Sequence, residues 1–322
     1  MNKINGQLKI SDDLLRSLSR FAPILGLVVL VLLFAVVSGG KSISANNLGI
    51  IGNQVIVTAL AAIGGVFAYS CGALDMSMGG SVCVCAISAA LIGQMTGSLP
   101  LMFLTAVCSA MLLALLKGFL AVFLHVPMFI LTIVLGMALS SLGLVLMGGT
   151  SVLNIASLVG SSQYTAVYIA LLGIFYMVSL VIFNYFTLGK HCRIVGGNRT
   201  TARQTGIDIN KTTIYAFLMG GVSIALATIV TLLRSKSISA KTADSLGTDM
   251  MVAIVLGGMP LSGGPKSKIS ASIVGAAIIT VLNNGLGIIG LDNGTIQFVR
   301  GILFLLVVFI TSFTYRSELL PR

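Results

Sequence analysis

The stretch Thr165–Phe186 reads TAVYIALLGIFYMVSLVIFNYF and contains no charged residue. A helix needs about 20 apolar residues to cross the roughly 30 Å of hydrocarbon in a bilayer, so this stretch predicts a membrane-spanning helix. The segment that follows, Thr187–Thr212, reads TLGKHCRIVGGNRTTARQTGIDINKT and carries five Lys or Arg residues against one acid, Asp208. Basic loops between spans are retained on the cytoplasmic side, so this loop orients the chain.

The composition of the 322-residue chain extends this interpretation to the whole protein. Hydrophobic residues make up 57% of it and charged residues 8%, whereas about a quarter of the residues in a soluble domain are charged. The net charge of +11 is gathered in clusters between apolar runs. Such clusters suit cytoplasmic loops beside anionic lipid, and they argue against binding to nucleic acid. We predict an all-α, multi-pass protein embedded in a lipid bilayer.

Apolar segments follow one another along most of the chain, and we count about ten transmembrane helices, two of them short or interrupted. We expect residues 1–20 to form an amphipathic cytoplasmic segment, residues 21–315 a single membrane domain, and residues 316–322 a short cytoplasmic tail. The apolar segments are Phe21–Val37, Gly49–Ser70, Val82–Gln94, Leu99–Leu124, Met128–Met147, Thr165–Phe186, Thr213–Leu233, Met250–Leu256 with its flanks, Ile269–Ile289 and Ile296–Phe313.

The orientation of the remaining loops follows by alternation from the cytoplasmic loop 187–212. Alternation places both chain termini in the cytoplasm and the uncharged segment Gly148–Tyr164 outside. Three basic residues, Arg234, Lys236 and Lys241, fall outside and are exceptions to the charge rule. The prediction is therefore a ten-span protein with both termini inside.

Two glycine-rich interruptions separate apolar segments, one in each half of the chain. Gly72–Ser81 reads GALDMSMGGS and Gly257–Pro265 reads GGMPLSGGP. Glycine and proline oppose a continuous helix, and corresponding breaks in two halves are typical of internally repeated transporters. Two ordinary glycine-rich cytoplasmic turns are the alternative. The candidate break or gate residues are Gly72, Asp75, Ser77, Gly79, Gly257, Gly258, Ser262, Gly263 and Gly264.

Asp75 lies inside the first interruption and is the only acid between residues 14 and 207. A charge at the centre of a bilayer costs about 2.5–3.5 kcal/mol on insertion scales, so its presence needs a reason. One interpretation is a pore or gating residue. The other is a helix N-cap at the membrane interface, whose carboxylate accepts hydrogen bonds from amides near Ser77. The sequence favours the cap without excluding the gate.

Catalytic machinery of its own is not expected in this chain. Two isolated histidines and few acids cannot supply a catalytic triad or a metal site. Gly40-Lys41-Ser42 resembles the end of a phosphate-binding loop, but Ala35 stands where that motif requires its first glycine. We therefore predict no enzyme activity, no metal and no cofactor in this chain. Any ATP-driven work would need ATP and magnesium bound by a partner.

Polar side chains within the apolar segments are candidates for lining a path for a solute. Asn53 and Gln54 lie in the second segment, and Asn283 and Asn284 in the ninth. Buried amides must be hydrogen-bonded, either across helices or to a passing polar solute, and adhesion between helices is the commoner role. Arg300, early in the last segment, is expected to extend its guanidinium to the interface.

Four stretches together resemble the permease subunits of ribose-type ABC importers, which move monosaccharides and related polar solutes. They cover most of the chain from about residue 50 onward. They are Gly72–Ser81, Val126–Thr132 (VPMFILT), Gly196–Ile207 (GGNRTTARQTGI), and Leu256–Gly264 (LGGMPLSGG) followed by Val281–Leu286 (VLNNGL).

The resemblance implies a permease that works with partner subunits in a bacterial inner membrane. A second permease copy or a paralogue would complete the translocation path, two ATPase subunits would bind on the cytoplasmic side, and an extracytoplasmic binding protein would deliver the solute. Gly196–Ile207 would be the coupling helix that enters a cleft on the ATPase and drives alternating access. The residues that this implies for coupling are Gly196, Gly197, Asn198, Arg199, Ala202, Arg203 and Gly206.

Two other assignments stay open at this stage. A stand-alone secondary transporter or facilitator would also tolerate repeats and broken helices, but it usually needs intramembrane acids, and Asp75 and Asp249 are almost all the chain offers. Within the importer family, a nucleoside or a furanose-type signalling molecule could replace the monosaccharide.

Overall fold

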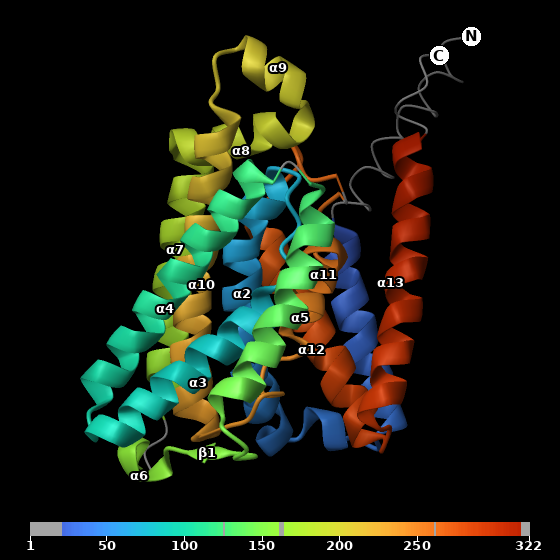
Figure 1. The fold of residues 1–322 in the computed structure, drawn as a ribbon. Coiled ribbons are helices and arrows are strands. Elements are labelled where there is room, and N and C mark those ends of the chain that lie inside the picture. The colour runs from blue at the N-terminus through green and yellow to red at the C-terminus, as the bar shows by residue number, and fades with distance from the viewer. Residues whose placement is uncertain (1–20, 125, 161–163, 261, 317–322) are drawn as a thin grey trace.

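A computed structural model describes residues 21–124, 126–160, 164–260 and 262–316, and Figure 1 shows its fold. The predictions for residues 1–20 and for the tail after Arg316 lie outside these residues. The described elements are a helix Phe21–Val37, η1 Lys41–Ile43, α2 Ala45–Ser70, α3 Met78–Thr96, α4 Leu99–Phe123, α5 Met128–Leu146, β1 Leu153–Asn154, α6 Ala156–Val159, α7 Thr165–Tyr185, α8 Thr187–Gly197, α9 Arg199–Gln204, α10 Ile209–Ser235, β2 Ser237–Ile238, α11 Leu246–Leu256, α12 Ser270–Ile288 and α13 Asn293–Arg316.

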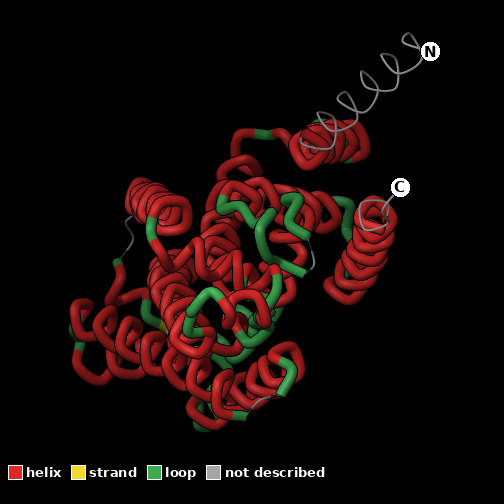
Figure 2. Tube along the Cα trace, turned by 90° about the horizontal axis from the view of Figure 1, so that it is seen from above, coloured by secondary structure: helices red, strands yellow, loops and turns green. Residues whose placement is uncertain are grey.

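Every predicted apolar segment falls on one of these helices, which confirms the all-α membrane fold. In the described part of the chain, seven helices are long and apolar enough to cross a membrane, namely α2, α3, α4, α5, α7, α10 and α12. The other three predicted apolar segments correspond to shorter apolar helices, Phe21–Val37, Leu246–Leu256 and Asn293–Phe309. Figure 2, seen from above, shows Phe21–Val37 and α13 at the edge of the helical bundle.

Close packing of small residues holds the centre of the bundle together. A methyl group added to Gly64 in α2 would lie 2.1 Å from Cβ of Ser223 in α10, so the two backbones nearly touch. The Ser223 hydroxyl donates a hydrogen bond to the carbonyl of Leu60 at 2.7 Å. Small residues and hydroxyls at helix contacts are the usual means of association inside a membrane, where the hydrophobic effect no longer distinguishes helix from lipid.

The two halves of the chain repeat the same packing. α2 is followed by a non-helical segment, residues 71–77, and then by α3; α10 is followed by residues 236–245, which contain the two-residue strand β2, and then by α11. α3 packs on α4 and α10, while α11 packs on α12 and α2. β1 and β2 pair at the end of the molecule opposite α9 (Figure 1). The fold therefore has internally repeated halves, as predicted.

The N-terminal ends of α3 and α11 meet inside the bundle. A methyl group on Gly79 would lie 2.5 Å from the carbonyl of Ala243, and one on Gly247 would lie 2.4 Å from the carbonyl of Met76. Only glycine allows backbones to approach so closely without displacement. α3 and α11 thus face each other with their N-terminal turns.

This packing corrects the predicted position of the second break. Residues 257–265 form the turn between α11 and α12, whereas the segment that corresponds to residues 71–77 is residues 236–245. Its sequence, KSISAKTADS, contains neither glycine nor proline, so it carried no signal of a break. The first break is also shorter than predicted, because α3 begins at Met78 and Gly79 lies in its first turn.

Candidate functional site

A bent arm of two short helices, residues 187–204, projects from one end of the bundle (Figure 1). It is called the coupling arm here, after the role that the family resemblance predicts for it. Asn198 separates its helices, and the side-chain oxygen of Asn198 accepts hydrogen bonds from the amides of Thr200 at 2.8 Å and Thr201 at 3.2 Å. This N-cap starts α9. Gly206, with φ of 79°, supplies the left-handed residue that ends it.

The exposed face of α9 carries two arginines. Arg199 and Arg203 are exposed and four residues apart, which places them on one side of the helix, whereas Ala202 is fully buried against the bundle. Arg193 in α8, in contrast, binds within the protein, because its guanidinium donates a hydrogen bond to the carbonyl of Phe183 at 2.6 Å. Beyond the arm, the backbone amide of Lys211 lowers the pKa of the exposed Asp208 carboxyl that caps α10.

Gly196 joins the coupling arm to the end of α2 and to the second glycine-rich segment through backbone alone. A methyl group on Gly196 would lie 1.8 Å from the carbonyl oxygen of Ser70, the last residue of α2, and 2.9 Å from the amide nitrogen of Gly264. The amide of Gly264 in turn donates a hydrogen bond to the Ser70 carbonyl at 3.1 Å. Three segments far apart in the sequence therefore share one contact with no side chain between them.

The neighbouring glycines of this junction extend the same contact. A methyl group on Gly263 would lie 2.1 Å from the carbonyl of Tyr69, and one on Gly197 would lie 3.1 Å from the ring of Pro265. Gly258, Gly263 and Gly264 all have positive φ. Gly72 and Ser262 also meet here, since a methyl group on Gly72 would lie 3.9 Å from the Ser262 carbonyl. Two predicted coupling residues, Gly196 and Gly197, thus lie beside four predicted gate residues, Gly72, Ser262, Gly263 and Gly264, whereas Asp75, Ser77, Gly79, Gly257 and Gly258 have other contacts.

Asp75 is buried rather than exposed at an interface. Its carboxylate forms an ion pair with Lys117 of α4 at 2.8 Å, and both side chains are 2% exposed. It also accepts hydrogen bonds from the amide of Ser77 at 2.9 Å and from the Ser77 hydroxyl at 2.6 Å. Lys117 donates a further hydrogen bond to the Ser81 hydroxyl at 3.1 Å.

The interpretation of Asp75 as an interfacial cap is therefore corrected in part. The carboxylate does bond to an amide at the start of α3, but its main partner is a cation 42 residues further along the chain. Lys117 was missed by sequence reasoning. A signal for it existed, because a single lysine inside the apolar segment Leu99–Leu124 needs an acid, and Asp75 was the acid without a partner.

At the end opposite the coupling arm, polar side chains line a pocket of about 490 Å³. It lies where α2 begins, α12 ends and α13 begins. Ile50, Ile288 and Ile296 add apolar wall. This hollow is called the polar pocket below, and its polar lining is Asn47, Gln54, Ser245, Asn283, Asn284, Asn293 and Arg300.

The four predicted pore residues do not all line the same pocket. Gln54, Asn283 and Asn284 line the polar pocket, whereas Asn53 does not. Asn284 also exchanges two hydrogen bonds with Asn47, at 2.9 and 3.0 Å, and so ties α12 to α2. The sequence offered two alternative roles for these amides, and Asn284 has both: it holds two helices together and it lines the pocket.

Arg300 does not extend to the interface as predicted, since it is buried and paired with Asp249 of α11. Its guanidinium also donates a hydrogen bond to the side-chain oxygen of Asn283 at 3.0 Å. The second carboxylate oxygen of Asp249 accepts a hydrogen bond from the Ser245 hydroxyl at 2.9 Å. The reason for the correction is electrostatic, because a buried acid within reach competes with water for the guanidinium.

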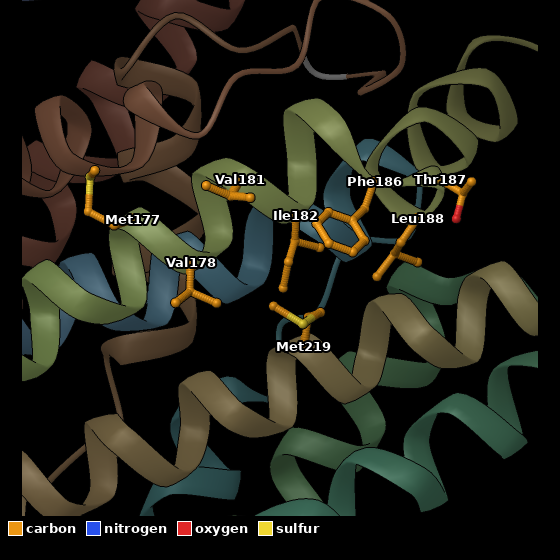
Figure 3. Close-up of a pocket in the computed structure, with 8 residues that line it drawn as sticks. All are labelled: Met177, Val178, Val181, Ile182, Phe186, Thr187, Leu188 and Met219. Carbon is orange, nitrogen blue, oxygen red and sulfur yellow. The ribbon is translucent and has the colours of Figure 1, made fainter.

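A second hollow, of about 600 Å³, is apolar and lies between α7, the start of α8, and α10. Figure 3 shows Val178, Ile182, Phe186 and Met219 pointing toward it. Apart from Thr187, the side chains that line it are apolar, so it offers little to orient a polar solute. We assign it no part in solute handling.

The sequence matches, over residues 47–308, the family described as branched-chain amino acid transport system / permease component. The chain belongs to this family. It is similar to the ribose import permease protein of Escherichia coli, with 27% identity over 300 residues, covering 88% of this chain and 92% of that protein. It is also similar to the galactofuranose transporter permease protein of Escherichia coli, with 26% identity, covering 81% of this chain and 78% of that protein.

A solved structure of a metal-chelate type ABC transporter in an inward-facing conformation shares the fold, with a TM-score of 0.50 and 14% identity, over 88% of this chain and 98% of that one. The family and the apolar helices together establish a multi-pass permease component of a bacterial inner-membrane transport system. The predicted family resemblance is confirmed.

Proposed function

We propose that this chain is the membrane-spanning subunit of an ATP-driven importer for a monosaccharide or a related small polar solute. The relatives named for ribose and galactofuranose support the solute class. A second permease copy or a paralogue, ATPase subunits that bind ATP and magnesium, and an extracytoplasmic binding protein complete the proposed assembly. The chain itself hydrolyses no ATP in this proposal.

The observation that carries the proposal is the junction at Gly196. An ATPase that moved α9 would move Gly196, and the backbone contact would pass that movement to Ser70 at the end of α2 and to Gly264 in the turn before α12. No flexible side chain lies in the contact to absorb the displacement. The coupling arm therefore acts on the two helices that carry Gln54 and Asn283 of the polar pocket.

The exposed arginines of α9 are the proposed contacts to the ATPase. Arg203→Ala should leave the permease folded and in the membrane, but ATP hydrolysis should no longer drive solute uptake. Lys211→Ala is the matched control, since it removes an exposed cation just outside the arm whose ion pair with Asp208, at 3.4 Å, contributes little. Normal ATP-driven uptake by Arg203→Ala, measured in cells with the complete importer, would contradict this role.

Co-purification tests the assembly directly. The solubilised permease should retain ATPase subunits, and replacement of the segment Gly196–Gly206 by a flexible linker should release them. A permease that purifies alone and moves solute in liposomes under an ion gradient would instead support a secondary transporter. The two buried pairs, Asp75 with Lys117 and Asp249 with Arg300, weigh against that alternative because both acids already have a cation.

A further inference from the structure

We propose that the polar pocket is a solute subsite, in which Asn283 and Arg300, itself held by Asp249, contact the hydroxyl groups of an uncharged sugar. This inference rests on the proposed function and adds the residues and the charge class of the solute. It concerns a pocket at the end opposite the coupling arm, where a solute delivered from outside the membrane would first meet the permease.

The pocket is held by a continuous chain of side-chain contacts. Asn283 accepts from Arg300 at 3.0 Å, Arg300 pairs with Asp249, and Asp249 accepts from Ser245 at 2.9 Å. Arg300 and Asp249 have only 9% and 11% of their side chains exposed. A site whose groups are fixed by one another loses little conformational freedom when a ligand binds, which favours recognition.

Binding capacity remains after these contacts are made. Nε of Arg300 is buried and has no hydrogen-bond partner in the part of the chain that the structure describes. Gln54 and Asn293 add carboxamides to the pocket wall, and carboxamides can both donate to and accept from a hydroxyl group. The volume of about 490 Å³ lies within the range of small-molecule sites.

The charges of the pocket select the class of solute. Arg300 lines the pocket and is neutralised by Asp249, which does not line it, and the other polar side chains of the lining are uncharged. A carboxylate brought to Arg300 would have to displace or repel Asp249. An amino acid would also bring an ammonium group, for which the residues that line the pocket supply no carboxylate. An uncharged polyol needs neither change, because its hydroxyl groups can hydrogen-bond to Arg300 and to the carboxamides while the ion pair stays intact.

The pocket is also connected to the place where α3 and α11 meet. Ser245 lines the pocket and is the N-cap residue of α11. Gly247, in the first turn of α11, packs against the carbonyl of Met76 before α3. A solute that repositions Ser245 would therefore act on the junction of α3 and α11. This places the subsite beside a part of the fold that alternating access must rearrange.

Protection of an introduced thiol tests the subsite in the complete importer. Asn293→Cys places a thiol on the exposed wall of the pocket, in a Cys108→Ala background that removes the exposed native cysteine. D-Ribose, D-xylose and D-galactose should slow its alkylation by a membrane-impermeant maleimide, and leucine should not. Met95→Cys, exposed at the same end but outside the pocket, is the control and should be alkylated equally fast with or without sugar.

The double variant Asp249→Asn/Arg300→Gln removes both charges at nearly constant volume, so that neither partner is left alone. It should raise the sugar concentration needed for half-protection about tenfold, the effect of weakening one or two hydrogen bonds to charged groups. Asn53→Ala, outside the pocket, should leave that concentration unchanged.

The outcomes separate this inference from the proposed function. ATP-driven sugar uptake without protection by any of the three sugars, or protection unchanged in the double variant, would overturn the subsite and leave the importer assignment intact. Protection by leucine alone would overturn the solute class. If the complete assembly takes up none of the three sugars in the presence of ATP, that result contradicts the proposed function itself, independently of the alkylation rate of the introduced cysteine.

Discussion

Replacing Lys117 by methionine should destabilise the protein more than any exposed charge substitution. The Lys117 ammonium and the Asp75 carboxylate lie 2.8 Å apart and are both 2% exposed. At an effective dielectric constant of about 20, their attraction is about 6 kcal/mol. The desolvation of each ion offsets it by several kcal/mol, so the pair is close to neutral as a whole. Its loss is not neutral, because Lys117→Met leaves Asp75 buried without a cation.

Breaking a buried pair in this way costs about 3–5 kcal/mol. For a chain of this size that corresponds to a fall of roughly 6–10 °C in the unfolding midpoint, at about 2 °C per kcal/mol. The assay is the thermal unfolding midpoint of the permease in detergent, followed by intrinsic tyrosine fluorescence or by the fraction that remains monodisperse. Lys117→Met/Asp75→Asn should recover most of the loss, because the second change removes the orphaned charge.

The matched control is Lys211→Met, which breaks an ion pair whose side chains are 74% and 48% exposed. An exposed pair contributes less than about 1 kcal/mol, so the midpoint should hardly move. If Lys117→Met and Lys211→Met had the same midpoint, or if the double variant were no more stable than Lys117→Met, the reasoning from burial would be refuted.

Two further predictions concern the junction between the coupling arm and the bundle. Gly196→Ala places a methyl group 1.8 Å from the Ser70 carbonyl, so it should push the arm away and abolish transport-coupled ATP hydrolysis. Gly173→Ala is the control, because the space around its Cβ is open. Full coupling in the Gly196→Ala variant would contradict the importance of the contact. Cys71 and Cys192 are buried free cysteines that interact with each other where α8 meets the end of α2, so oxidation should join them and stop uptake until a reductant is added. Uptake that persists once the disulfide is demonstrated by mass spectrometry would show that the arm need not move against α2.

The membrane fold could be predicted from the sequence because its signal is local. Thr165–Phe186 has no charge and becomes α7, Thr165–Tyr185, with one residue of difference at its end. The ends of α9 also have a local signal, since Asn198 and Gly206 are residues that start and stop a helix by their own chemistry. Each of these features depends on residues within one or two turns of one another.

The candidate site was less predictable because its partners are far apart in sequence. Asn283 and Asn284 are neighbours, yet one bonds to Arg300 and the other to Asn47, since adjacent residues on a helix point about 100° apart. The break at residues 236–245 was missed for another reason. It is kept out of a helix by packing against the start of α3 around Gly79, not by glycine or proline of its own.

The buried charges also indicate where the energy for transport must come from. Among the described residues, the buried charged side chains are Asp75, Lys117, Asp249 and Arg300, and they form two neutral pairs. Coupling to a proton or sodium gradient typically uses an intramembrane acid that can exchange its cation. Here each acid is already held by a lysine or arginine that cannot leave the chain. This favours the proposal that the movement is imposed from outside the membrane, and the backbone junction at Gly196 is a contact able to receive it.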